Sequence, residues 1–145
     1  MSASESVVSV ALVDAARAAR EHAAAEYSGF KVGAALETRA GDIVTGCNVE
    51  NATYGLTVCA ERIALFKALS EGHRRFTRVV VVASTESPTP PCGACRQLLW
   101  EFCGDVEVVL ANETVVAARH RLAALFPHPF DASLLGSPRG APPRA

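Results

Sequence analysis

The sequence has no excess of charge of either sign and no long hydrophobic run. Its 145 residues include 14 Lys and Arg against 15 Asp and Glu, which gives a formal net charge of -1. Without a basic excess the chain has no electrostatic basis for holding a polyanion, so we expect no nucleic-acid partner. No apolar run approaches the roughly 18–20 residues that cross a bilayer, so we expect no membrane association.

The first residues lack the features of a signal peptide. The segment Met1 to Ser6 is acidic rather than basic and leads into no apolar stretch. We therefore expect a cytoplasmic protein. In a reducing compartment, an odd set of five cysteines indicates metal ligands or core residues rather than disulfides. The five are Cys47, Cys59, Cys92, Cys95 and Cys103.

Hydrophobic residues make up 50% of the chain, enough for one folded core at this length. We expect a single domain over residues 1–136 and a Pro-rich, disordered tail over residues 137–145. Hydrophobic spacing predicts helices and strands in alternation. Helices are expected at 7–26, 59–71, 93–102 and 120–126, and strands at 31–38, 43–47, 78–83, 106–110 and 114–118. This order predicts a layered α/β domain with a five-stranded sheet.

Two short motifs indicate a metal site, and each lies where a loop meets a predicted helix. Cys92 and Cys95 are three residues apart, so at a helix start both thiols face the same way. Cys59 and Glu61 are two apart, about 200° around a helix, so we place Cys59 at the cap and Glu61 in the first turn. Three thiolates would bind one zinc ion per chain and leave a fourth position for water, as in catalytic sites.

Two alternatives to an open catalytic site would use the same cysteines. A closed structural zinc site needs a fourth ligand, but Cys47 lies at a strand end and Cys103 about three helical turns beyond Cys92. The four histidines are isolated in the sequence. A redox-active pair is disfavoured by the neighbouring Cys-Ala-Glu motif and by the proline before Cys92. The open site is therefore favoured.

The residues beside the predicted ligands suggest how the site works. Zinc lowers the pKa of a coordinated water from 15.7 toward about 7, and Glu61 is the acid placed to move its proton. A divalent zinc with three thiolates is negatively charged, which weakens its Lewis acidity. We predict that Arg62 and Arg96 donate hydrogen bonds to the sulfurs and restore it.

Five motifs occur in order along most of the chain. They are Tyr27–Leu36, Gly46–Gly55, Thr57–Arg62, Pro91–Gln97 and Leu125–Phe130. Together they resemble the small homotetrameric cytidine deaminases, part of the cytidine and deoxycytidylate deaminase superfamily. Two positions depart from that pattern: residues 24–26 replace a usual aromatic-x-Pro, and Phe126 stands where Leu is common.

The resemblance implies a three-layer α/β/α fold with a mixed five-stranded sheet. It implies zinc-dependent hydrolysis of cytidine and 2'-deoxycytidine to the uridine nucleosides and ammonia, in pyrimidine salvage. It also implies a homotetramer with shared active sites. The implied substrate contacts are Phe30 against the nucleoside, Asn48 and Glu50 at the ribose hydroxyls, the Ala60 backbone at the reacting group, and Tyr54 and Phe130 where subunits meet.

Three rival functions share part of this pattern. A deaminase of a cytosine nucleoside antibiotic, of the blasticidin S type, would have the same three cysteines and glutamate. A polynucleotide deaminase would need a basic groove that the charge balance does not provide. A non-catalytic zinc module would close the fourth metal position and leave Glu61 without a purpose.

Overall fold

The computed structural model describes residues 8–136, so the expectations for the first residues and for the Pro-rich tail lie outside it. None of the described helices is long and apolar enough to cross a membrane. The elements are α1 Val10–Arg20, β1 Val32–Thr38, β2 Ile43–Cys47, the 3-10 turn η2 Tyr54–Leu56, α2 Ala60–Ser70, β3 Phe76–Ala83, α3 Gly93–Cys103, β4 Glu107–Ala111, β5 Val116–Arg121, α4 Leu122–Leu125 and the 3-10 turn η3 Ala132–Leu135.

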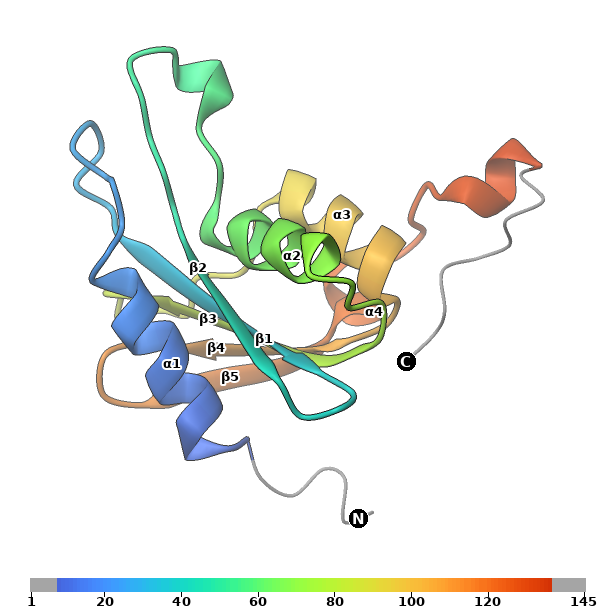
Figure 1. Ribbon diagram of the computed structural model, residues 1–145, viewed down its shortest axis with the longest axis horizontal. Coiled ribbons are helices and arrows are strands. Elements are labelled where there is room, and N and C mark those ends of the chain that lie inside the picture. Colours follow the sequence, from blue (N-terminus) through green and yellow to red (C-terminus); the bar gives the residue numbers. More distant parts are fainter. Residues whose placement is uncertain (1–7, 137–145) are drawn as a thin grey trace.

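The five strands form one sheet in the order β2-β1-β3-β4-β5. The β3–β4 pair is parallel and the other three pairs are antiparallel, which confirms the mixed five-stranded sheet. Helix α1 lies on one face of this sheet, and α2 and α3 lie on the other (Figure 1). The result is the expected three-layer arrangement.

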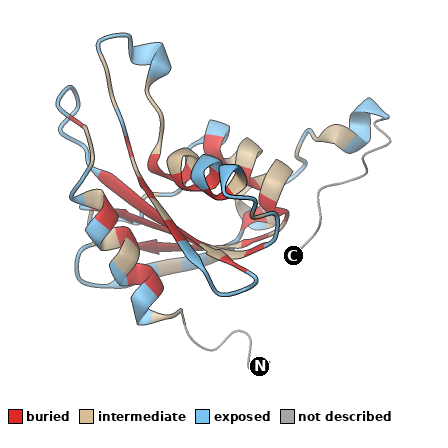
Figure 2. Cartoon of the chain, in the orientation of Figure 1, coloured by how far each residue is buried: buried red, intermediate tan, exposed pale blue. Residues whose placement is uncertain are grey.

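The valine run in β3 explains why this strand lies at the centre. Val79 and Val81 belong to the core cluster under α2 and α3, whereas Val80 and Val82 belong to the cluster under α1. Successive side chains of a strand point to opposite faces, so a strand covered on both faces needs apolar residues at every position. Figure 2 accordingly shows β1, β3 and β4 largely buried between the two helical layers.

Several predicted boundaries were wrong. β3 starts at Phe76 rather than residue 78, and β5 continues to Arg121, so His120 lies in a strand and not in the last helix. Local hydrogen bonds explain two further differences. The first helix ends at Arg20 rather than near residue 26, because Ala24 pairs with the chain after β2: its N–H donates to Asn48 O and its carbonyl accepts from Glu50 N. The last strand starts at Val116 rather than residue 114. There the Asn112 side chain accepts from the N–H groups of Thr114 and Val115 and forms a local turn.

A row of charged side chains crosses four strands of the sheet. Arg78 on β3 donates to Glu37 on β1 (3.2 Å) and to Glu107 on β4 (2.8 Å), and Arg119 on β5 also donates to Glu107 (2.5 Å). Burial acts to raise the pKa of Glu107, but the hydrogen bonds from Arg119 and Arg78 outweigh it and hold the pKa below its ordinary value. The row therefore keeps Glu107 ionised and links the outer strand β5 to the centre.

Replacement of Glu107 by Gln should destabilise the protein in a pH-dependent way. Because the folded-state pKa is lowered, the carboxylate stabilises the fold above its unfolded value of about 4.3, and this stabilisation disappears as the pH falls through the lower folded value. We expect a loss of about 1–3 kcal/mol at neutral pH, since two hydrogen bonds to a charged group are removed. Thermal unfolding between neutral pH and about pH 3 would measure it.

The matched control is Glu86→Gln, since Glu86 is an exposed loop acid. This variant should follow the wild type at every pH. A Glu107→Gln deficit that stayed constant down to the lowest pH would contradict the assignment of the effect to the ionised carboxylate.

Candidate metal centre

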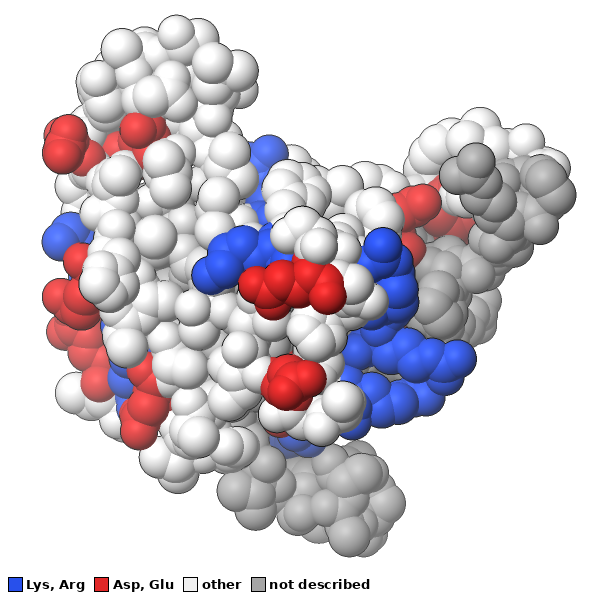
Figure 3. Space-filling view, in the orientation of Figure 1, with Lys and Arg blue, Asp and Glu red and all other residues white. Residues whose placement is uncertain are grey.

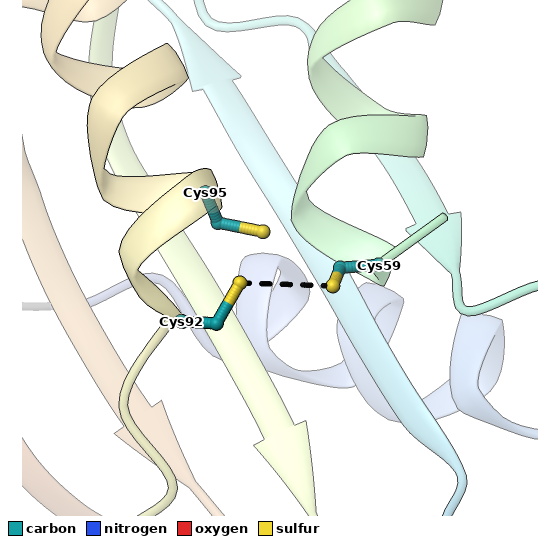
Figure 4. A group of neighbouring side chains, drawn as sticks. All are labelled: Cys59, Cys92 and Cys95. Carbon is teal, nitrogen blue, oxygen red and sulfur yellow. Dashed lines mark hydrogen bonds between the residues drawn. The ribbon is translucent and has the colours of Figure 1, made fainter. Parts of the chain in front are cut away.

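Three cysteine sulfurs meet where two helices begin. Cys59 is the N-cap of α2, Cys92 is the N-cap of α3, and Cys95 lies in the first turn of α3. The three Sγ atoms lie within 4.8 Å of one another, and Cys59 Sγ and Cys92 Sγ are 3.8 Å apart (Figure 4). We call these three residues the sulfur cluster. Cys59 has the cap position that its spacing from Glu61 predicted.

The dimensions of the sulfur cluster fit a tetrahedral zinc ion. Zn–S bonds of about 2.3 Å place two tetrahedral sulfurs about 3.8 Å apart, the separation found between Cys59 and Cys92. Within residues 8–136 no fourth ligand belongs to this group. Cys103 is buried in the main core cluster, where burial raises its pKa to about 12. The donor set is therefore that of an open site, with Cys92 exposed to solvent.

Hydrogen bonding within the sulfur cluster prepares one thiol for deprotonation. A hydrogen bond from the Cys95 thiol and, beyond it, bonds from Arg62 and Cys92 lower the pKa of Cys59 to about 5 against the opposing effect of burial. The same bond to Cys59, together with burial, raises the pKa of Cys95. Thiolates are the form that binds metal, so a cluster whose hydrogen bonds favour the deprotonation of one thiol suits a metal ion.

Arg62 lies against the sulfur cluster as the sequence predicted. Its Nη2 donates to Cys59 Sγ at 3.5 Å and to Thr57 O at 3.2 Å. Its Nε is buried without a hydrogen-bond partner, so the guanidinium still has a donor to offer in this region. A positive, partly unsatisfied donor beside three thiols is the environment that a negatively charged metal–thiolate group requires.

Arg96 does not make the predicted contact with a sulfur. It donates instead to two backbone carbonyls, from Nε to Pro91 O (2.8 Å) and from Nη1 to Leu125 O (2.6 Å). The physical reason is its position, one residue and about 100° around the helix from Cys95, so the two side chains point in different directions. Arg96 thus joins the turn before Cys92 to the end of α4.

Glu61 is the acid nearest the sulfur cluster, and its environment changes its acidity. The side chain is in the first turn of α2 and only 5% exposed. Burial raises its pKa to about 7; the negative charge of Cys59 adds to this, while a hydrogen bond from its own backbone N–H opposes it. A carboxyl group with a pKa near neutrality can both accept and release a proton at physiological pH.

The predicted sugar-binding residues lie on the segment that follows β2. The Asn48 side chain donates to Phe30 O (2.8 Å) and accepts from Val32 N (2.9 Å). These two bonds fix the backbone where β1 begins. Val49 and Val58 exchange two backbone hydrogen bonds of 2.9 and 3.0 Å. Because Val58 precedes Cys59, this bridge connects the segment of Asn48 and Glu50 directly to the sulfur cluster.

Glu50 is held by a residue that the sequence analysis did not single out. Ser28 donates to it from its hydroxyl (2.5 Å) and from its N–H (3.0 Å), and Tyr27 N donates as well. These bonds, the Ser28 hydroxyl first, lower the pKa of Glu50 and keep it ionised. A signal was present in the Ser-Gly pair next to Phe30, which is typical of a tight turn with free N–H groups.

Tyr54 and Phe130 lie at the periphery, 73% and 58% exposed. The Tyr54 ring packs edge-on against Tyr27, with centroids 5.6 Å apart. Phe130 belongs to residues 127–136, which we call the C-terminal arm. Gln97 donates to Phe130 O (2.8 Å) and Trp100 donates to Asp131 (3.0 Å), so α3 holds the arm through two residues that the sequence analysis missed.

The chain is similar to zinc-binding deaminases. A family model described as the cytidine and deoxycytidylate deaminase zinc-binding region matches residues 7–112. A cytidine deaminase of Halalkalibacterium halodurans is 55% identical over 102 residues, which cover 70% of this chain and 77% of that protein. The crystal structure of a cytidine deaminase from Burkholderia pseudomallei matches with a TM-score of 0.82 at 50% identity, covering 86% of this chain and all (100%) of that one. A blasticidin-S deaminase of Bacillus cereus is 34% identical over 87 residues, which cover 54% of this chain and 62% of that protein.

The different contacts of Arg62 and Arg96 predict different losses on substitution. Arg62→Gln removes the donor to Cys59 Sγ and should weaken zinc retention about 10–100-fold. Arg96→Gln removes bonds to two carbonyls, so it should cost about 1–3 kcal/mol of folding stability and change zinc retention less. Chelator competition and thermal unfolding on both variants would separate the two roles. Equal zinc losses in both would contradict the assignment.

Proposed function

The chain belongs to the cytidine and deoxycytidylate deaminase family, and on this basis we propose that it hydrolyses cytidine and 2'-deoxycytidine. The products are uridine or 2'-deoxyuridine and ammonia, with water as the second substrate. The observation that carries the proposal is the open sulfur cluster of Cys59, Cys92 and Cys95 beside the buried acid Glu61.

The three sulfurs would hold one zinc ion, and zinc in such a site supplies a water of lowered pKa as the nucleophile. Glu61 is the group that would take one proton from this water and pass it to the ring nitrogen of the base. It would then take the second proton, from the new hydroxyl group on the ring carbon, and pass it to the amino group, which leaves as ammonia while the carbonyl of uridine forms. Its burial in the first turn of α2, beside the sulfur cluster, places it where such a transfer would occur. Arg62 balances the charge of the thiolates, and the Ala60 backbone borders the reacting group.

The sugar and the base are assigned to the neighbouring residues. Glu50, kept ionised by Ser28, and Asn48 would bind the ribose hydroxyls, and Phe30, which is 42% exposed, would pack against the nucleoside. An amide and a carboxylate suit a neutral sugar with free hydroxyls. This pair, together with the lower similarity to the blasticidin-S deaminase, favours the simple nucleoside over an antibiotic.

The charge distribution supports a small neutral substrate over a polynucleotide. On the face in Figure 3, uncharged side chains cover most of the surface, and most of the basic side chains form one patch at the right rather than a run across the face. A strand-tracking groove needs a continuous run of basic side chains. The corresponding cellular role would be pyrimidine salvage in the cytoplasm.

We further propose a homotetramer in which neighbouring chains complete each active site. Two segments extend from the body of the chain, the loop around η2 and the C-terminal arm with η3 (Figure 1). Both carry exposed apolar side chains, namely Tyr54, Leu56, Phe130, Leu134 and Leu135. Exposed apolar groups on extended segments are typical of surfaces that other subunits cover.

Turnover of cytidine by the purified protein tests the reaction, the substrate class and the acid at once. We expect the absorbance of cytidine to change to that of uridine, with one zinc per chain, and the rate to fall at least about 10²-fold in Glu61→Ala. Glu86→Ala, an exposed loop acid, is the control and should keep the wild-type rate.

Three outcomes would overturn part of this proposal. Turnover of blasticidin S without turnover of cytidine would assign the antibiotic as substrate. Zinc binding without turnover of either compound would identify a structural zinc module. Full activity of Glu61→Ala would remove Glu61 as the acid.

Mixing two inactive variants tests the shared active site. In a chain with Glu61→Ala the arm is intact, and in a chain with Phe130→Ala the acid is intact. If Phe130 acts in a neighbour's site, random mixing restores about one site in four, so the mixture should be more active than either parent. Mixed oligomers without any gain in activity would show that Phe130 serves its own chain or none.

A further inference from the structure

Gly46, on β2, lies under the first turn of α2 at a distance that excludes any side chain. A Cβ at this position would lie 2.5 Å from Ala60 O, 2.5 Å from Ala64 N and 3.0 Å from the Cβ of Ile63. Contacts below 3.0 Å essentially never occur, and here two of the three atoms belong to the helix backbone, which has no flexible end to rotate away. To restore an ordinary contact of 3.4 Å the helix would have to move by about 0.9 Å.

The part of α2 that touches Gly46 is the part that carries the chemistry. Cys59 caps the helix there, and Glu61 and Arg62 occupy its first turn. On the other side of the cap, the Val49–Val58 bridge fixes the residue before Cys59. The start of α2 therefore contacts the sheet at Gly46 on β2, and the residue before its cap pairs with Val49, just after β2. The contact at Gly46 limits how closely α2 can approach the sheet.

We propose that Gly46 is a positioning residue of the metal centre. By lacking a side chain it sets the depth of the first turn of α2 on the sheet, and with it the separation between the Cys59 sulfur on α2 and the two sulfurs on α3. A displacement of about 0.9 Å is large beside the 3.8 Å between Cys59 Sγ and Cys92 Sγ, because bonds of about 2.3 Å to one ion fix that separation.

Gly33 provides a matched control on the neighbouring strand. A Cβ there would lie 2.1 Å from Ala16 O and 2.7 Å from Arg20 N, backbone atoms of α1 on the opposite face of the sheet. The obstruction is of the same kind, a side chain against a helix backbone. Helix α1 carries none of the proposed ligands or substrate-binding residues, so the consequence for the sulfur cluster should differ.

The experiment compares the wild type with Gly46→Ala and Gly33→Ala. Both variants should unfold at a lower temperature. In Gly46→Ala, zinc affinity by chelator competition should fall about 10–100-fold, and the absorbance spectrum of the Co²⁺-loaded protein should change. In Gly33→Ala, the zinc affinity and the Co²⁺ spectrum should both match those of the wild type. Wild-type zinc affinity in Gly46→Ala, or an equal loss in Gly33→Ala, would overturn the proposal.

Turnover of cytidine is measured on the same samples, because it tests the proposed function whereas zinc affinity tests the role of Gly46. Only an effect of Gly46→Ala on turnover would rest on the proposed function. Weaker zinc binding in Gly46→Ala with no deamination by the wild type would leave the positioning role intact and reject the activity. If Gly46→Ala does not fold, amide hydrogen exchange of the wild type tests instead whether α2 packs closely on β2 at this point. We expect the Ala64 amide, covered by β2, to exchange among the slowest; exchange as fast as the exposed Lys67 would overturn the proposal.

Discussion

The sulfur cluster depends on the start of α2 and the start of α3 lying side by side on one face of the sheet. A helix N-terminus provides unsatisfied N–H groups and the positive end of the helix dipole, which stabilise thiolates. Two such ends lie beside the three sulfurs, which are within 4.8 Å of one another. The chain as a whole has a formal net charge of -1, so this stabilisation is local to the helix ends. The sheet fixes both helices, so the precision of the centre comes from backbone packing, while the side chains supply the chemistry.

The sequence predicted the features that depend on local spacing. The two-residue gap between Cys59 and Glu61 placed one at the cap and the other in the first turn, and hydrophobic spacing predicted the strand that forms β3. Features that depend on tertiary partners were not predictable in this way. Arg96 and Arg62 each follow a site residue, but only Arg62 contacts a sulfur; the partner carbonyls of Arg96 come from Pro91 and from Leu125, 29 positions away. The end of α1 was mistaken because alanine continues a helix readily, whereas Ala24 is engaged by Asn48 and Glu50.

The sulfur cluster and the C-terminal arm both depend on α3. Its first turn presents Cys92 and Cys95, and further along Gln97 and Trp100 hold the C-terminal arm. Arg96 connects the two regions, since it donates to the carbonyl just before Cys92 and to the end of α4, from which the arm continues. Because one helix contacts both, the position of Phe130 depends on the positions of Cys92 and Cys95.

Cys59 and Cys92 are 33 residues apart and lie on either side of β3 in the sequence. An ion bound to both would therefore act as a covalent-like crosslink around the whole of α2 and β3. In chain-entropy terms a closed loop of this size restricts the unfolded ensemble by roughly 3–4 kcal/mol, as a disulfide would. Unlike a disulfide, this crosslink needs no oxidant and can be removed by chelation. A chain that loses its ion would thus lose the group that activates water. It would also lose the crosslink that stabilises the segment containing α2 and β3 against unfolding.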